Sequence, residues 1–369
     1  MLPFLSPIQP IETRTVLRKA AQAHRFLAEL KGVAATISNE SILINTLSLQ
    51  EAKDSSAVEN IITTHDELFR AELFESLAVG PATKEVQHYA AALRKGFALV
   101  KEQNVLTVNH ILVIQWELEQ NEAGFRKLPG TALVNQQTGQ VVYMPPQHPG
   151  EIRALMDNLE RFINDEEFYD ADPLVKMALI HYQFESIHPF YDGNGRTGRI
   201  LNILYLVMQG LLGAPILYLS RYIIQHKADY YRLLQAVREE DAWEAWTLYM
   251  LDAVEQTARQ TIELVGQIRS LMQDYKHRLR RDLPKLYSQD LLNNLFRHPY
   301  TKIDFLVSEL GVTRLTATRY LDLLVENGFL QKQKIGRSNF YVNSPLLKLF
   351  VTMPPVDANV PVVRTVTTL

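Results

Sequence analysis

The sequence predicts a mainly α-helical protein that carries one β-hairpin and ends in a small, separate unit of helices and strands. Three observations support this fold class. Apolar residues recur at helical spacing through most of the first 281 residues. Strand-forming residues flank a polar turn within residues 131–143. Residues 285–345 combine short helical patterns with strand patterns. A chain of 369 residues is long enough for two or three such domains.

The composition is typical of a globular protein in a reducing compartment. Apolar residues make up 47% and charged residues 21%, and a net charge of −3 gives no global sign of a nucleic-acid or membrane partner. The absence of cysteine excludes disulfides, thiol catalysis and Cys-ligated zinc. The first residues, MLPFLSP, lack the basic region of a signal peptide. We therefore expect a cytoplasmic location and no membrane partner.

Helices are expected before the hairpin. The predicted segments are 15–31, 39–53 and 66–123, the last broken at Gly80-Pro81 and near residues 103–104. Gly32 follows the first segment and is the expected C-cap. Between the second and third segments, the pattern around residues 54–61 has two interpretations. In the simpler one it caps the next helix, and Glu59 is a solvated acid of its first turn.

Residues 131–143 predict a β-hairpin. Arms rich in Val, Leu and Tyr flank the turn Asn-Gln-Gln-Thr-Gly. In its simplest interpretation this hairpin only patches a helical domain. Helical patterns follow at residues 151–164 and 173–187, and the second of them ends directly before residue 188.

Residues 188–199, HPFYDGNGRTGR, are the most informative stretch of the chain. A Gly-rich turn that enters a helix points backbone N–H groups outward at the positive end of the helix dipole, which suits phosphate. Arg196 and Arg199 are three residues apart and share one helix face, so both can fork onto phosphate oxygens. Asp192 is a hard oxygen ligand suited to Mg²⁺, and His188 can act as a base near neutral pH.

An apolar run follows this stretch and predicts a buried helix that ends near Gly210. Asn, Gln, Gly and Pro interrupt residues 200–219, which favours a core helix over a membrane span. Residues 220–231 then supply aromatic and amide groups that suit a purine, among them Gln225, Tyr230 and Tyr231. A last long helix runs from Trp243 towards Arg281.

Residues 285–345 resemble a winged helix-turn-helix, a fold that often reads DNA. Three helical patterns are followed by two strand patterns that would form the wing. The candidate DNA contacts are Arg314, Thr316, Arg319, Lys334 and Arg337. Eight basic against five acidic residues are a mild excess for a DNA-binding domain, so dimerisation or protein docking is an equal alternative.

The stretch 188–199 resembles the Fic family signature, His-x-Phe-x-(Asp/Glu)-Gly-Asn-Gly-Arg-x-x-Arg, at every defined position. The resemblance implies transfer of AMP from ATP to a Tyr, Thr or Ser hydroxyl of a target protein. In these terms His188 is the catalytic base and Asp192 the Mg²⁺ ligand. The implied nucleotide-binding residues are Gly193, Asn194, Gly195, Arg196, Thr197, Gly198 and Arg199, with Gln225, Tyr230 and Tyr231 on the adenine side. Fic relatives that phosphorylate their targets replace the glycine at position 195 with lysine, so Gly195 favours AMP transfer.

The resemblance also gives the second interpretation of residues 55–60. Inhibited Fic proteins carry a helix with Ser/Thr, three residues, Glu and then Gly/Asn, which Ser55, Glu59 and Asn60 match. Glu59 would then pair with Arg199 where the γ-phosphate of ATP belongs, since two anions compete for one guanidinium. Fic proteins use the hairpin as a flap that holds the target as an added strand. Its candidate residues are Thr131, Leu133, Val134, Val141 and Val142.

The predicted organisation is a Fic helical core with a β-hairpin flap and a C-terminal winged helix. The predicted parts are a helical leader at 1–110, the Fic core at 111–260, a helical linker at 261–284, the winged helix at 285–345 and a disordered tail at 346–369. The predicted function is an autoinhibited protein adenylyltransferase that uses ATP and Mg²⁺ and forms a homodimer. Two alternatives stay open: a DNA-binding regulator whose Fic domain senses nucleotide, and an enzyme that removes AMP with Glu59 positioning a water.

Overall fold

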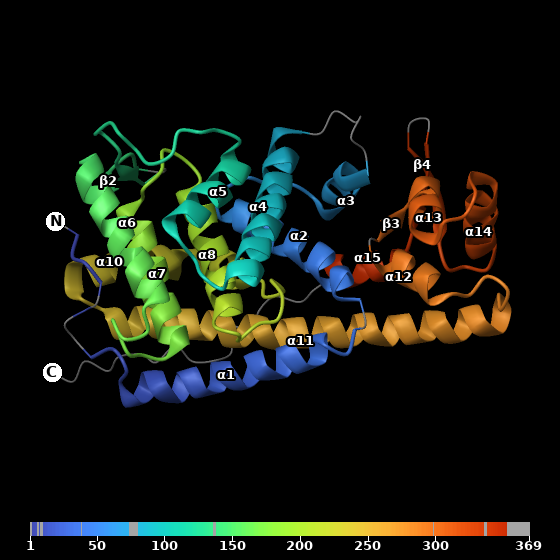
Figure 1. Ribbon diagram of the computed structural model, residues 1–369, viewed down its shortest axis with the longest axis horizontal. Helices are drawn as coiled ribbons and strands as arrows, with labels where there is room; N and C mark the ends of the chain where they lie inside the picture. The colour runs from blue at the N-terminus through green and yellow to red at the C-terminus, as the bar shows by residue number, and fades with distance from the viewer. Residues whose placement is uncertain are drawn as a thin grey trace.

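The computed structural model describes residues 1–369 except residues 1, 6, 8, 9, 38, 74–79, 136, 137, 298, 336, 337 and 353–369. The described chain is mainly helical, as the sequence predicts (Figure 1). The helices of its first 240 residues are α1 (Arg14–Ala34), α2 (Glu40–Val58), α3 (His65–Leu73), α4 (Pro81–Gln103), α5 (Val108–Glu119), α6 (Pro149–Asn164), α7 (Pro173–Ile187), α8 (Asn194–Met208), α9 (Leu219–Gln225) and α10 (Lys227–Glu240).

Helix α8 lies at the centre of the core. It packs against α2, α4, α5, α7 and α9. Residues 174–187 of α7 are buried without interruption, and so are residues 196–206 of α8. A helix that is covered on all sides needs apolar residues on all sides, which explains why the run after the Gly-rich turn resembles a membrane span in composition. No helix among the described residues has the length and apolar character needed to cross a bilayer.

The predicted hairpin is confirmed. Strands β1 (Leu133–Val134) and β2 (Val141–Tyr143) pair antiparallel, with Leu133 opposite Tyr143 and Val134 opposite Val141. The register shifts between the two pairs, which marks a bulge.

Helix α11 (Trp243–Asp282) runs along the molecule beside α1 and joins the helical core to the C-terminal unit (Figure 1). That unit contains α12 (Gln289–Arg297), β3 (Tyr300–Thr301), α13 (Ile303–Leu310), α14 (Arg314–Glu326), β4 (Gln331–Ile335), β5 (Ser338–Val342) and α15 (Ser344–Val351). The strands form an antiparallel sheet in the order β3-β5-β4. Helix-strand-helix-helix followed by two antiparallel strands is the element order that the winged helix-turn-helix prediction expects.

The C-terminal unit packs on two N-terminal helices, α2 and α3. Helix α12 contacts α2, and α3 contacts β3. The Tyr300 hydroxyl donates a hydrogen bond to Asp66 of α3. The ring of Phe69 lies 6.3 Å from that of Tyr300 and 6.1 Å from that of Phe350, measured between centroids. The C-terminal unit therefore contacts both α2, which ends at Val58, and α3, which begins at His65.

Three boundaries differ from the prediction. Gly32 lies inside α1, whose C-cap is Ala35. Gly32 is not among the glycines with positive φ, so it does not adopt the left-handed conformation of a C-cap glycine. The leader boundary at residue 110 falls inside α5, because Thr107 caps that helix by accepting the amide of His110. Residues 346–351 belong to α15 rather than to a disordered tail, since Leu346 and Phe350 are buried in the core. The rest of the predicted tail, 353–369, lies outside the described residues.

Candidate active site

Residues 188–199 form the turn between α7 and α8, as predicted. His188 caps α7 in the left-handed region with φ of 49°, and Gly193 caps the start of α8 with φ of 76°. Glycine is favoured at Gly193 because side chains rarely adopt this backbone conformation. The turn thus brings the imidazole of His188, the loop amides and the first turn of α8 to one place.

Asn194 shapes this loop. Its Oδ1 accepts the amide of Phe190 at 2.8 Å, and its Nδ2 donates to the Phe190 carbonyl at 2.9 Å. The Phe190 ring is buried beside Phe125 and Phe184, with centroids 5.4 and 6.3 Å away. The side chain of Asn194 is therefore used within the loop, whereas the sequence analysis assigned it to the nucleotide.

Arg126 is a site residue that sequence reasoning missed. It is fully buried, and its Nε donates to the His188 carbonyl and its Nη2 to the Pro146 carbonyl, both at 2.7 Å. It therefore ties residues 188–193, the candidate catalytic loop, to the residues that follow the hairpin. A single arginine in a loop outside any motif gives no sequence signal for such a role.

The imidazole of His188 is neutral at physiological pH. Burial disfavours its charged form and, together with the nearby Arg126 cation, lowers its pKa to about 4, although the Glu59 carboxylate acts in the opposite direction. A neutral imidazole has a free lone pair, so it can accept a proton from a substrate hydroxyl.

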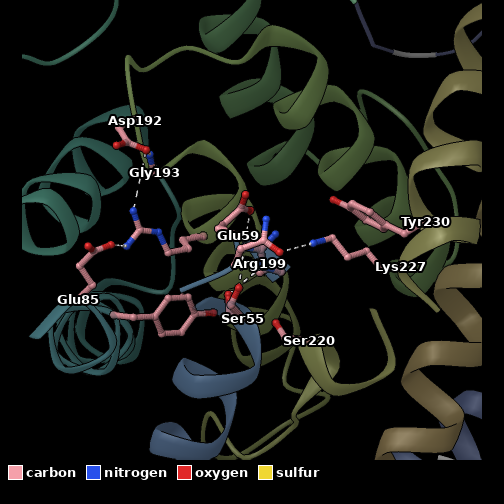
Figure 2. A network of polar contacts seen from close by, with 12 residues as sticks. Ser55, Glu59, Glu85, Asp192, Gly193, Arg199, Ser220, Lys227 and Tyr230 are labelled. Atoms are coloured by element: carbon pink, nitrogen blue, oxygen red, sulfur yellow. Dashed lines mark hydrogen bonds and ion pairs between the residues drawn. The ribbon is translucent and has the colours of Figure 1, made fainter. Parts of the chain in front are cut away.

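Glu59 and Arg199 form the ion pair that the sequence predicts. Arg199 is buried, and its Nη2 donates to Glu59 Oε1 at 2.8 Å and to the Ser55 carbonyl at 3.0 Å, while its Nε donates to Ser55 Oγ at 2.8 Å. Figure 2 shows Arg199 between Ser55 and Glu59. Burial would raise the pKa of Glu59, but the charge and hydrogen bond of Arg199 outweigh it and hold that pKa below its ordinary value.

Glu59 follows the last residue of α2 and reaches the first turn of α8. A Cβ atom on Gly195 would overlap with Glu59 Oε1, so the carboxylate lies directly on the backbone of the Gly-rich turn. Asn60 follows with φ of 63°, and its Oδ1 accepts a hydrogen bond from Lys227 Nζ at 3.2 Å. A carboxylate here occupies a surface suited to a phosphate group.

Arg196 is held by two acids from other helices. Its Nη1 donates to Glu85 Oε2 at 3.1 Å, and its Nη2 donates to Glu119 Oε1 at 2.8 Å. Asp192 Oδ1 lies 3.9 Å from the same Nη2 and accepts the Gly193 amide at 2.7 Å. The Asp192 side chain is 79% exposed. Figure 2 shows Glu85 on the same side of the site as Asp192 and Gly193.

Asp192 fits a Mg²⁺ ion that arrives with a nucleotide. The described residues contain no group of three or more metal-ligating side chains. Mg²⁺ on nucleotides is usually held by one or two carboxylates, with phosphates and waters completing its octahedron. One exposed carboxylate beside an anion-binding turn meets this requirement.

Of the two tyrosines predicted on the adenine side, Tyr231 is half-exposed and Tyr230 is buried. Tyr230 is buried and its hydroxyl pairs with His181 Nε2 at 2.9 Å, so it packs in the core beside Arg199. Tyr231 is half-exposed, and its ring meets that of Tyr230 edge-on at 5.1 Å. Gln225 is the last residue of α9. Thr197 and Gly198 are buried in the first turns of α8.

The flap lies beside the catalytic loop. The predicted residues Val134, Val141 and Val142 are exposed, and Thr131 and Leu133 are half-buried. The Tyr143 hydroxyl donates to the Ser186 carbonyl at 3.0 Å, and the guanidinium of Arg238 lies 3.9 Å from the centre of the Tyr143 ring. These contacts hold β2 against α7 and α10.

Helix α14 and strand β4, which carry four of the candidate DNA contacts, lie towards the opposite end of the molecule from α7 (Figure 1). Arg314 and Arg319 are exposed on α14, Thr316 is half-buried, and Lys334 is exposed on β4. Arg314 Nη1 donates to Asp304 Oδ1 at 2.6 Å, which pairs this cation within the protein. Arg337 lies outside the described residues.

Glu51 is a second site residue that the sequence analysis missed. It lies on α2 one turn before Ser55 and is buried, with Ser220 donating from both its amide and its hydroxyl and Tyr89 donating at 3.2 Å. Burial is the largest cause that raises the pKa of Glu51, to about 8. This protonated acid therefore joins α2 to α4 and α9 beside Arg199.

Glu51→Gln should make thermal stability less sensitive to alkaline pH. The folded state keeps the Glu51 proton up to about pH 8, whereas the unfolded chain loses it near pH 4.5. Stability present below pH 4.5 is therefore lost as pH rises through about 8. Between pH 5 and pH 9 the Tm of wild type should therefore fall relative to that of Glu51→Gln. Glu29→Gln, at an exposed position, is the control. An equal difference at both pH values would mean that Glu51 is ionised in the folded protein.

Comparison with known proteins agrees with this geometry. Residues 17–98 match the Fic/DOC family N-terminal model, residues 105–206 match the Fic/DOC family, and residues 271–346 match the model "Protein adenylyltransferase SoFic-like, C-terminal domain". Over 112 residues the chain is 34% identical to "Protein adenylyltransferase Fic" of Drosophila erecta and 33% identical to that of Aedes aegypti. Each match covers 30% of this chain and 21% of the relative, so the chain spans about a fifth of the length of these curated relatives.

Solved structures share the fold. A Fic family protein from Desulfovibrio desulfuricans superposes with a TM-score of 0.59 at 18% identity, over 92% of this chain and 98% of that one. Fic-1 from C. elegans superposes with a TM-score of 0.52 at 20% identity, over 68% of this chain and 73% of that one. The chain therefore contains a Fic/DOC domain with the N-terminal region of that family and a C-terminal domain of the SoFic-like type.

Proposed function

We propose that the protein transfers AMP from ATP to a Tyr, Thr or Ser hydroxyl of a target protein, and that Glu59 holds this activity down. The observation that carries the proposal is the Glu59 carboxylate, paired with Arg199 and lying on Gly195 at the start of α8. An anion already occupies a surface suited to phosphate. The two insect relatives are named protein adenylyltransferases, which supports the same reaction.

The chemistry begins at His188. Its neutral imidazole takes the proton of the target hydroxyl, and the hydroxyl oxygen attacks the α-phosphorus of ATP. A new bond forms between that oxygen and phosphorus, while the bond to the bridging oxygen of the β-phosphate breaks and pyrophosphate leaves. The amides of residues 194 and 195, in the first turn of α8, stabilise negative charge on the transferring group, whereas the Gly193 amide is bound to Asp192.

The two arginines of the turn and Asp192 position the nucleotide. Arg196 and Arg199 hold the outer phosphates once the glutamates that pair with them have been displaced. Bound Mg²⁺ would be held by Asp192 with the phosphates and would neutralise charge on them. The exposed β1-β2 hairpin supports docking of an extended target segment as an added strand.

Radiolabel transfer tests the proposal. The 369-residue chain is incubated with Mg²⁺ and ATP labelled at either the α- or the γ-phosphate, alone and with a cell lysate. Label should enter protein from the α-phosphate only. Label from the γ-phosphate would instead identify a kinase, and no label from any nucleoside triphosphate, in the Glu59→Gly variant as well, would refute group transfer.

Transfer should persist at acidic pH. Because the pKa of His188 is lowered to about 4, the imidazole stays unprotonated and active well below the ordinary histidine value of about 6.5. We expect kcat/KM of the Glu59→Gly variant to fall only below pH 6, with the loss following His188 protonation. A steady-state pH profile with fixed Mg²⁺ checks this. An acid limb centred at pH 6.5 or above would show that His188 is solvated in the working enzyme.

The winged helix supports a second candidate function, DNA binding. Exposed Arg319 and Lys334 lie on α14 and β4, the elements that enter and flank a DNA groove in this fold. Binding that weakens as salt rises, and that is lost in an Arg319→Ala/Lys334→Ala variant, would support it. We further propose that the protein forms a homodimer. A cytoplasmic location is also proposed, because a chain without cysteine suits a reducing compartment.

A further inference from the structure

Two glutamates approach the Gly-rich turn in the same way. Glu59 follows the C-terminal end of α2, contacts Gly195 and pairs with Arg199. Glu119 is the last residue of α5 and pairs with Arg196. A Cβ atom on Gly193 would overlap with Glu119 Oε1, just as one on Gly195 would overlap with Glu59. Each acid thus covers one glycine of the turn and one arginine of α8.

The position of Glu119 destabilises its own helix, α5. A carboxylate at a helix C-terminus faces the negative end of the dipole. Its side chain is only 13% exposed, so it is also largely desolvated. Burial, the strongest effect, and the neighbouring Asp192 and Glu85 carboxylates raise the pKa of Glu119 despite the attraction of Arg196. The contacts that offset this cost come from the first turn of α8, the surface where phosphate is expected.

We infer that Glu119 is a second inhibitory carboxylate, which occupies Arg196 and the face of Gly193 and must be displaced before nucleotide phosphates bind there. This inference rests on the proposed function, because it assumes that Arg196 holds phosphate. Glu85 differs: its side chain is 42% exposed, and it contacts the other nitrogen of the guanidinium without covering the turn.

The inference explains why both arginines are buried in ion pairs in the same structure. The Arg196 and Arg199 side chains are 4% and 1% exposed, and each has a carboxylate partner at 2.8 Å. Removing Glu59 alone frees Arg199 and the face of Gly195. The turn then still carries Glu119 on Gly193, so inhibition is only partly relieved.

The test measures nucleotide binding without turnover. Glu119→Gln keeps the shape and an acceptor for Arg196 but removes the competing charge. In the 369-residue chain carrying His188→Ala, with Mg²⁺ present, Glu119→Gln should tighten ATP binding about tenfold. This change corresponds to about 1.4 kcal/mol and is measured by titration calorimetry. AMP, which lacks the outer phosphates, should bind as before. Exposed Glu122→Gln, three residues away, is the matched control.

The competing hypothesis is that Glu119 only orients Arg196. In that case Glu119→Gln should weaken ATP binding and raise KM, and this result, or unchanged ATP affinity, would overturn the inference. Glu119→Ala serves as a second variant if the amide change disturbs folding, which thermal melting reveals. Because affinity is read without transfer, failure of the proposed reaction would leave this measurement intact. Conversely, if Glu119→Gln leaves ATP affinity unchanged, only the inference about Glu119 fails. Label transfer by Glu59→Gly would still test the proposed reaction.

Discussion

Glu59→Gly should raise label transfer from ATP about 100-fold. The wild-type carboxylate pairs with Arg199 at 2.8 Å and lies on Gly195, so a nucleotide must displace an anion that is already bound. A coupling free energy of about 3 kcal/mol, at the upper end of the usual range, corresponds to about two orders of magnitude. Initial rates of label transfer to protein, at saturating Mg²⁺ and several ATP concentrations, measure the effect.

Two further variants distinguish inhibition from other roles of Glu59. Glu59→Gln keeps the size of the side chain and removes its charge, so it should be activated less than Glu59→Gly. If Glu59 instead positions a water that removes AMP from modified protein, Glu59→Ala should abolish that removal and leave transfer unchanged. Equal transfer by wild type and Glu59→Gly would exclude inhibition by this residue.

His188→Ala in the Glu59→Gly background should lower transfer about a thousandfold. A positioned general base contributes about 10²–10⁴ to the rate, and His188 is the base that we propose for this reaction. The loss should appear in kcat, while ATP affinity measured by calorimetry should change little because the proposed phosphate site lies on α8 and not on the imidazole. Quenched-flow or gel-based label assays provide the rate.

The control for this variant is another histidine outside the site. His148 is exposed at the start of α6, and His148→Ala should retain full transfer. Transfer by His188→Ala within tenfold of its parent would mean that water or another group removes the hydroxyl proton. Loss of ATP binding together with transfer would point to a collapsed loop instead, since the His188 carbonyl accepts from Arg126.

The helical core, the hairpin and the winged helix could be predicted because their signals are local. Helical spacing, the Asn-Gln-Gln-Thr-Gly turn and the two strand patterns near the C-terminus depend only on neighbouring residues. The prediction failed where a local signal competed with packing. Gly32 stays helical inside α1, and residues 346–351 form α15 because Leu346 and Phe350 find a core to enter.

The sequence by itself determined the chemistry of the Gly-rich turn, because His188, Asp192, Arg196 and Arg199 stand within twelve consecutive residues. With the Fic resemblance it also identified Glu59 as the partner of Arg199. The distant groups that meet in the site could be found only from the folded chain. Arg126 comes from a loop, Glu51 from α2, and Glu85 and Glu119 from α4 and α5. Each has a hydrogen-bond partner more than 60 residues away in the chain. Such contacts form because a buried polar or charged group is costly unless it is hydrogen-bonded or paired. The spacing of residues in the sequence does not show which distant groups will meet in this way.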